Sequence, residues 1–191
     1  MAEITGVLLA AGASARFGAN KLIELLQGEP LVLHSVRALA PCDRIIAVVR
    51  QGDNELHELL QANGVETALN LRSWRGMGSS IACGVKATKD SDGWCILPAD
   101  MPRVLPATTA QVVAALCSGA ALVAPYYQNR RGHPVGFSKA YALQLAALDS
   151  DLGARHIVEQ HGDRVSRIDT DDAAVVMDVD TAQDLAMLET V

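Results

Sequence analysis

Residues 4–21 read ITGVLLAAGASARFGANK, and this stretch decides the fold. The apolar run from Ile4 to Ala10 has the Val and Leu content of a strand that is buried on both faces in a parallel sheet. The segment from Ala11 to Lys21 is rich in glycine and other small residues, which is typical of a loop. Open α/β sheets bind ligands where their strands end, so the sequence predicts a ligand-binding loop here.

Segments typical of strands and helices alternate along the first two thirds of the chain. This alternation predicts a Rossmann-like α/β fold with a mostly parallel sheet and helices on both faces. An arginine-rich polar stretch at 125–134 predicts a small β excursion. No repeat or linker is evident, so we expect one domain over residues 1–191. Further strands are expected at 44–49, 65–69, 94–97, 121–124, 135–137, 165–168 and 175–179, and helices at 30–39, 54–61, 79–87, 108–116, 140–148, 153–161 and 181–189.

Composition limits the classes of function. Half of the 191 residues are hydrophobic, only 4% are aromatic, and the formal net charge is −6. An acidic balance argues against a nucleic-acid partner, which would require a basic face. The N-terminal apolar run is too short to span a membrane and no basic segment precedes it, so we expect neither a signal peptide nor a membrane anchor, and a cytoplasmic location.

The loop has the chemistry that polyphosphate binding requires. Its small residues let backbone N–H groups approach phosphate oxygens. Arg16 offers a planar fork of donors and Lys21 a compact charge. The spacing of Gly12 and Gly18 fits neither the GxGxxG fingerprint nor the Walker A motif. An ordinary glycine-rich turn with solvated basic residues is the competing interpretation.

Five motifs carry a family resemblance. Residues 9–21 match every specified position of LAAGxSxRFGxxK, the signature of nucleotidyltransferases related to molybdenum-cofactor nucleotidylation. Later stretches are GMGSS at 76–80, LPADMP at 97–102, GHP at 132–134 and DVDT at 178–181. In this order they resemble the cytidylyltransferase (MocA-like) branch of the MobA-like NTP transferase family, over nearly the whole chain.

The resemblance implies a reaction and its charged residues. CMP would pass from CTP to the terminal phosphate of molybdopterin, the organic part of the molybdenum cofactor, with release of pyrophosphate. Arg16, Lys21 and Asp100 would be catalytic, and Asp100 with Asp180 would bind Mg²⁺, with Asp178 held in reserve. Asp100 follows a buried strand between two prolines, which suits a metal ligand. Capping of a turn or helix is the alternative for both Asp100 and Asp180.

The resemblance also implies which residues contact the two substrates. The nucleotide would contact the loop at Leu9, Ala10, Ala11 and Gly12 and a second segment at Asn70, Gly78 and Ser79. Guanylyltransferases of the family read LAGG where this chain reads LAAG, and the methyl group of Ala11 would reduce the room beside a purine, which favours CTP.

The acceptor phosphate is already ionised, so it needs orientation rather than a general base. Arg130, Arg131, His133 and Arg155 are candidates to bind this phosphate, with His133 and Arg155 taken as the main contacts. Solvated surface positions are the alternative for the arginines, and a turn position for His133. A molybdoenzyme or its chaperone would receive the product.

Three other functions remain open from the sequence. The chain could use GTP, or it could transfer a nucleotide to a sugar phosphate or polyol phosphate. It could also be a binding module that holds a nucleotide without chemistry. The presence of both Lys21 and Asp100 argues against this last function.

Overall fold

A mixed sheet forms the centre of the molecule in the computed structural model, which describes residues 2–12, 17 and 20–189. The strand order is β10-β7-β9-β6-β1-β4-β5, and β8 pairs with β7. All pairs are parallel except those that β9 makes with β6 and β7 and that β8 makes with β7. The strands are β1 (Ile4–Ala10), β4 (Arg44–Arg50), β5 (Glu66–Asn70), β6 (Gly93–Pro98), β7 (Leu122–Tyr127), β8 (Arg130–Arg131), β9 (Val135–Ser138) and β10 (Val165–Asp169).

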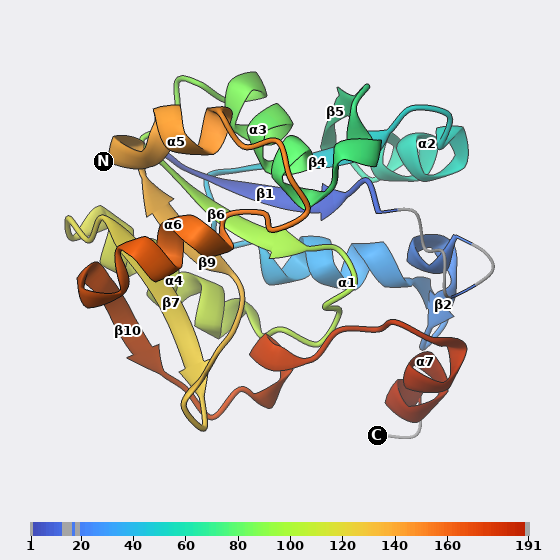
Figure 1. Cartoon of the computed structure of the whole chain (residues 1–191). Coiled ribbons are helices and arrows are strands. Elements are labelled where there is room, and N and C mark those ends of the chain that lie inside the picture. Colours follow the sequence, from blue (N-terminus) through green and yellow to red (C-terminus); the bar gives the residue numbers. More distant parts are fainter. Residues whose placement is uncertain (1, 13–16, 18–19, 190–191) are drawn as a thin grey trace.

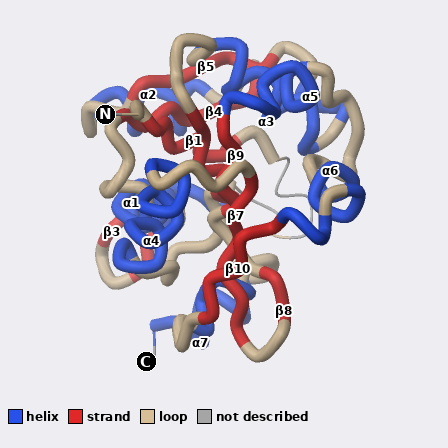
Figure 2. Tube along the Cα trace, turned by 90° about the vertical axis from the view of Figure 1, so that its left-hand side faces the viewer, coloured by secondary structure: helices blue, strands red, loops and turns tan. Residues whose placement is uncertain are grey.

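Helices cover both faces of this sheet, as Figures 1 and 2 show. One hydrophobic core lies between the sheet and α1 (Leu31–Ala38), α2 (Asn54–Ala62) and α4 (Pro106–Cys117). The other lies under α3 (Met77–Ala87), α5 (Ala142–Ala146) and α6 (Arg155–Gln160). Leu8 of β1 belongs to the first core and its neighbour Val7 to the second, because successive strand residues point to opposite faces. The predicted fold class is therefore confirmed.

The last strand predicted from the sequence, at 175–179, is wrong. The chain forms a 3₁₀ turn at Ala173–Val176 instead, and then runs extended to α7 (Ala182–Glu189). The turn begins because a carboxylate oxygen of buried Asp172 accepts the N–H of Ala174 at 3.1 Å. Such a local side-chain bond competes with strand pairing. Of the apolar residues of this segment, which suggested a strand, Val175 is instead fully buried in the turn.

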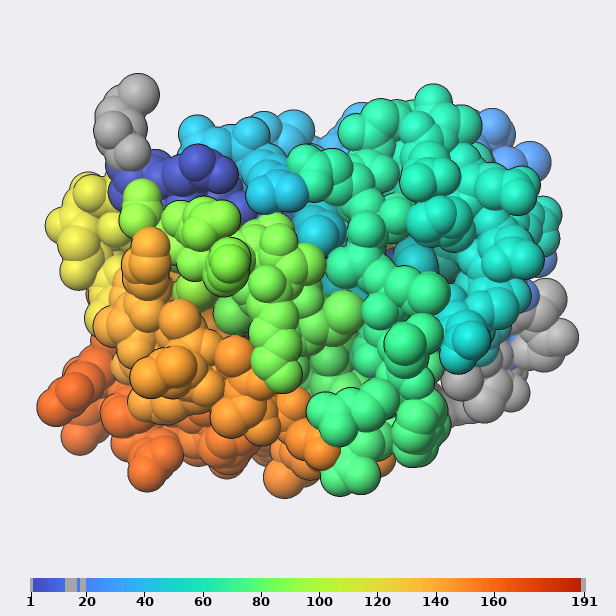
Figure 3. Space-filling view, turned by 90° about the horizontal axis from the view of Figure 1, so that it is seen from above, coloured from blue at the N-terminus to red at the C-terminus, as the bar shows by residue number. Residues whose placement is uncertain are grey.

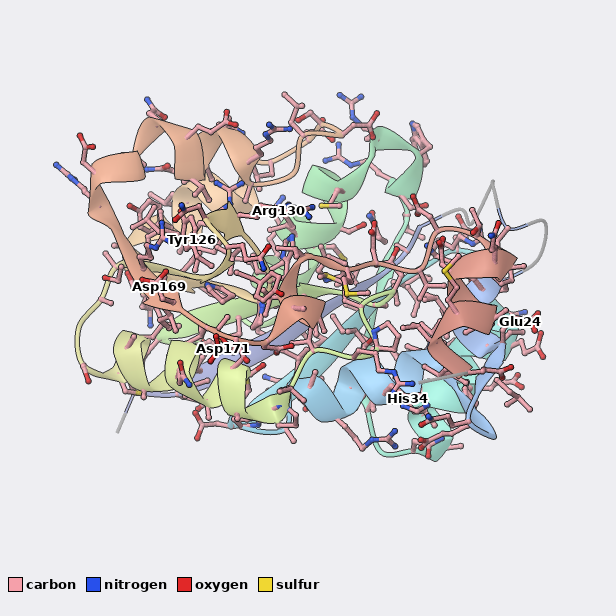
Figure 4. The ribbon with its side chains drawn as sticks, turned by 90° about the horizontal axis from the view of Figure 1, so that it is seen from below. Glu24, His34, Tyr126, Arg130, Asp169 and Asp171 are labelled. Atoms are coloured by element: carbon pink, nitrogen blue, oxygen red, sulfur yellow. The ribbon has the colours of Figure 1, made fainter. Side chains whose placement is uncertain are left out.

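A two-stranded hairpin, β2 (Leu25–Leu26) and β3 (Glu29–Pro30), was not predicted. Gln27 and Gly28 form its two-residue turn with φ values of +55° and +80°. This is the sign pattern of the tight turns that join antiparallel strands. His34 on α1 fastens the hairpin, because its Nε2 atom lies 2.9 Å from the carbonyl oxygen of Leu26 (Figure 4).

The predicted β excursion is present as β8 and β9. Gln128 and Asn129 turn the chain back between β7 and β8, and β9 then enters the sheet between β6 and β7. Tyr126 of β7 is the register partner of Asp169 of β10 (Figure 4). Because β9 is antiparallel to β6, its first residues lie beside the last residues of β6.

None of the helices among the described residues is both long and apolar enough to cross a membrane.

Candidate active site

A cleft of about 590 Å³ opens at the edge of the sheet where β1, β4 and β6 end. Its volume lies in the usual range for small-molecule sites. Leu9, Ala11 and Gly12 line it from the end of β1 and the start of the loop. Ala10 does not line the cleft, because strand alternation turns its side chain into the core, where it is fully buried. Arg16 lies outside the described residues.

Lys21 and Asp100 form an ion pair at the side of this cleft. Nζ of Lys21 lies 2.7 Å from Oδ2 of Asp100, 2.6 Å from the carbonyl oxygen of Val179 and 3.5 Å from Oδ1 of Asp180. Asp100 lines the cleft, whereas the Lys21 side chain is mostly buried behind it. Lys21 and Asp100, which were both predicted to be catalytic, are therefore adjacent. The ammonium group of Lys21 contacts the carboxylates from the buried side of the cleft wall.

Three carboxylates gather at this point. One oxygen each of Asp100, Asp178 and Asp180 lies within 4.8 Å of the others. Partial burial of the carboxyl group raises the pKa of Asp178, and the negative charges of Asp100 and Asp180 raise it further. Asp178, which was held in reserve as a metal ligand, thus belongs to the same cluster as the predicted ligands Asp100 and Asp180.

This cluster fits a divalent cation. Oδ1 of Asp100 is buried and has no hydrogen-bond partner in the described part of the chain, while Oδ2 receives Lys21. A buried carboxylate oxygen without a donor is costly, and a hard cation is a natural partner for it. Mg²⁺ usually takes one or two carboxylates and fills its other positions with phosphate and water.

The alternative role of Asp180 as a helix cap does not fit the contacts. Thr181 and Asp184 form a reciprocal pair at the start of α7: Oγ1 of Thr181 accepts the N–H of Asp184, and Oδ2 of Asp184 accepts the N–H of Thr181 at 2.7 Å. These two residues are the capping pair. The carboxylate of Asp180 instead faces Lys21.

The second predicted nucleotide segment has a different geometry from that expected. The side chain of Asn70 is buried and donates to the hydroxyls of Ser79 and Ser80 at 2.9 and 3.1 Å. The hydroxyl of Ser79 in turn lies within hydrogen-bond distance of the carbonyl oxygens of Arg72 and Gly76 and can donate its hydrogen to either. Asn70 and Ser79 therefore brace the loop from inside, and Ser80 lines the cleft in their place.

Gly76 and Gly78 bring this loop against the segment between α5 and α6. The N–H of Gly78 donates to the carbonyl oxygen of Ser150 at 2.8 Å, and a Cβ on Gly78 would lie 2.7 Å from that oxygen. Gly76 has φ of +92°, and a Cβ there would overlap Asp151. Gly78, which was predicted to contact the nucleotide, thus allows its backbone to pack closely against the backbone of Ser150.

A second hollow of about 280 Å³ adjoins the cleft and contains three of the four predicted acceptor residues, whereas the fourth, Arg130, lines a different hollow together with Asp100 and Asp178. Arg131, His133 and Arg155 line the second hollow together with an apolar floor that includes Phe137. Leu9, Met77 and Asp151 border both hollows. His133 and Arg155 come from segments far apart in the sequence, so the fold brings together the candidates that sequence reasoning grouped.

His133 reaches this position because it precedes the antiparallel strand β9. Its N–H donates to the carbonyl oxygen of Val175 at 2.8 Å, and its buried Nδ1 atom has no partner among the described residues. Burial lowers the pKa of His133, and nearby Arg131 lowers it further, which favours the neutral ring. Arg155 is exposed and pairs with Glu159 on the same helix at 2.8 Å.

Arg50 is a cleft residue that sequence reasoning missed. It ends β4, lines the cleft, and lies 3.3 Å from the buried carboxylate of Asp53. The side-chain amide of Asn20 donates to the other oxygen of Asp53 at 2.8 Å. The end of the loop before Lys21 is thereby tied to the end of β4. The position of Arg50 at the end of a predicted strand was the available signal.

The fold and the cleft define a class of protein, the nucleotidyltransferases with a mostly parallel α/β sheet. Residues 6–165 match the model of the MobA-like NTP transferase domain, and the chain belongs to that family. Among curated relatives, a molybdenum cofactor guanylyltransferase of Burkholderia ambifaria is 32% identical over 159 residues, covering 80% of this chain and 75% of its own. A nicotine blue oxidoreductase of Paenarthrobacter nicotinovorans is 26% identical over 195 residues, covering 97% and 96%.

Solved structures have the same fold. Rv0371c of Mycobacterium tuberculosis superimposes with a TM-score of 0.88 at 24% identity and covers 100% of this chain and 98% of its own. Its homologue from Mycobacterium sp. strain JC1 has a TM-score of 0.82 at 29% identity, covering 97% and 96%. A nucleotidyl transferase of Methanothermobacter has a TM-score of 0.83 at 19% identity, covering 98% and 96%.

Proposed function

We propose that this protein transfers CMP from CTP to the terminal phosphate of molybdopterin, giving the cytosine dinucleotide form of the molybdenum cofactor and pyrophosphate. The observation that carries the proposal is the pairing of Lys21 with Asp100, 2.7 Å apart, inside a cluster of three carboxylates at a nucleotide-sized cleft. The molybdenum cofactor guanylyltransferase from Burkholderia supports the acceptor, since it shares the family.

The chemistry requires positioning and charge neutralisation rather than proton transfer. A Mg²⁺ ion bound by Asp100 and Asp180 would stabilise the negative charge that develops on the phosphates. Lys21 holds Asp100 and Asp180 together, because its ammonium contacts both carboxylates. Arg50 adds a positive charge to the cleft wall. In the proposed reaction Arg16 would contribute a further positive charge to the phosphates.

The second hollow is the proposed site of the acceptor. It shares Leu9, Met77 and Asp151 with the cleft, so a phosphate bound there is close to the nucleotide. Arg131 and Arg155 can donate hydrogen bonds to that phosphate, and His133 lines the same hollow, while the apolar floor suits the flat ring system of a pterin. The product would then pass to a molybdoenzyme or to its chaperone.

The choice of base is proposed from Ala11. This residue is 6% exposed and lies at the boundary between the core under α3 and the cleft, so we propose that its methyl group limits the room beside the base. We expect Ala11→Gly to shift the ratio of kcat/KM for GTP over CTP upward by about tenfold, since one methyl group contributes about 1–3 kcal/mol to such selectivity. Ala10→Gly removes a methyl that faces the core and should leave the ratio unchanged. An unchanged ratio in Ala11→Gly would remove the case for CTP.

The direct test combines purified protein, Mg²⁺, molybdenum cofactor and either CTP or GTP, and measures pyrophosphate. Release with CTP well above that with GTP is expected. Release with GTP alone would make the protein a guanylyltransferase, and release only with a sugar or polyol phosphate as acceptor would change the acceptor class. Binding of a triphosphate without release under any of these conditions would indicate a binding module.

One further assay follows from the relative of Paenarthrobacter nicotinovorans, which matches 97% of this chain. Because that protein is called a nicotine blue oxidoreductase, reduction of nicotine blue should be measured as well. The carboxylate cluster and its lysine favour nucleotidyl transfer, so no reduction is expected. Dye reduction without pyrophosphate release would overturn the proposal.

A further inference from the structure

Trp74 is an aromatic residue of the cleft that the proposed chemistry does not use. It lies in the 3₁₀ turn Ser73–Arg75, lines the cleft, and is 76% exposed. The other tryptophan, Trp94, is fully buried and donates its indole N–H to Thr88. Tryptophan is enriched among the side chains that carry most of the energy of binding.

The backbone that carries Trp74 is fixed on both sides. Oγ of Ser79 lies 3.0 Å from the carbonyl oxygen of Arg72 and 2.8 Å from that of Gly76, which bracket the turn, and its one hydrogen can be donated to either. Nε of Arg75 lies 2.7 Å from Oδ1 of Asp149. In Figure 3 the segment around this turn, in green, lies beside the orange segment that follows α5. The indole is thus presented by a rigid support, which reduces the entropy lost on binding.

The position of the carboxylates orients any nucleotide in the cleft. Phosphates belong near Asp100 and Gly12, so the base belongs at the part of the cleft away from the carboxylate cluster. Trp74 lies in the turn that precedes α3, and Met77 and Ser80 from the start of that helix line the cleft with it. Asp151 is a charged residue of the cleft beside this turn, next to Gly76. A flat apolar ring at this part of the cleft suits a flat heterocycle.

We propose that the nucleobase of the bound triphosphate stacks on the indole of Trp74. The inference rests on the proposed function only in requiring a nucleoside triphosphate in this cleft. It depends neither on the acceptor nor on the identity of the base, because every base offers a π-face for stacking. Trp74 therefore contributes affinity and orientation, while the residues beside the edge of the base select between bases.

The test uses the fluorescence of the intact protein. Trp74 is exposed and Trp94 is buried, so the emission that acrylamide quenches belongs to Trp74. Titration with CTP and Mg²⁺ should quench this emission saturably and protect it from acrylamide. Calorimetry should show that Trp74→Ala raises the Kd for CTP and for GTP by a similar factor, about 5- to 150-fold. Trp74→Phe, which keeps a ring, should stay within about fivefold of wild type.

Leu71→Ala is the matched control. Leu71 is an exposed apolar residue three positions earlier that does not line the cleft, so its removal should leave the Kd unchanged. Calorimetric binding of CTP with no quenching and an unchanged Kd in Trp74→Ala would overturn the stacking and leave the transferase proposal intact. A loss of affinity for one base alone would also overturn it. Absence of triphosphate binding to the wild type would overturn the transferase proposal itself.

Discussion

Asp100→Asn is expected to lower turnover by about 10²–10³-fold, the loss that is typical when one preorganised group that stabilises the charge of a transition state is removed. Asparagine keeps the shape of the side chain but removes the charge beside Asp178 and Asp180. Nucleotide affinity should change far less than turnover, because the cleft wall is otherwise retained. Pyrophosphate release and calorimetry on the same preparation measure the two effects separately.

The fold should survive this substitution. Lys21 keeps the carbonyl oxygen of Val179 and the carboxylate of Asp180 as partners. Asp171→Asn, which changes an exposed aspartate outside the cleft, is the control and should behave as wild type. Removal of divalent ions with EDTA should stop turnover in the wild type, and added Mg²⁺ should restore it. Wild-type turnover in Asp100→Asn would contradict the role given to this carboxylate.

Gly76→Ala is expected to destabilise the protein and distort the cleft, although Gly76 has no side chain that could take part in the reaction. Gly76 has φ of +92° and ψ of −171°, a region populated almost only by glycine. An added Cβ would also lie 2.6 Å from Cα of Asp151, so moving the Asp151 side chain cannot remove the overlap. We expect a loss of about 2–4 kcal/mol in the free energy of unfolding, from backbone strain and overpacking together.

Gly119→Ala separates these two contributions. Gly119 also has a positive φ, +97°, but a Cβ there would meet nothing within 4 Å. Its variant therefore reports backbone strain alone, and chemical denaturation of both variants gives the contact contribution by difference. Equal losses in the two variants would mean that the contact between Gly76 and Asp151 contributes nothing. Gly76→Ala should in addition weaken nucleotide binding, whereas Gly119→Ala should not.

The sheet and its helices could be predicted because each has a local signal. β1 occupies the predicted residues because its apolar run ends at a loop of small residues. The hairpin β2–β3 was missed because its strands have two residues each, too few to show alternation. The predicted strand at 175–179 was wrong because its apolar pattern does not reveal that Asp172 starts a turn.

The candidate site was predictable in its charged residues and less so in its polar ones. Asp100 and Asp180 follow from motif and position, and they lie in one cluster. Sequence spacing could not tell that Asn70 and Ser79 face inward while Ser80 faces the cleft, because that depends on how the loop packs. Trp74 was missed because a single tryptophan has no pattern of its own. Arg50 was missed although its position at the end of a predicted strand could have indicated it.

The antiparallel direction of β9 determines which changes of length the chain can accept. His133 is held where β9 begins, by the sheet on one side and by Val175 on the other. The turn at Gln128–Asn129 lies beyond this anchor, at the far end of β7 and β8. Residues inserted at that turn would extend the β7–β8 ribbon into solvent and leave His133 where it is. Residues inserted between Gly132 and Val135 would move His133 out of the second hollow, so tolerance to insertion should change abruptly within a few positions.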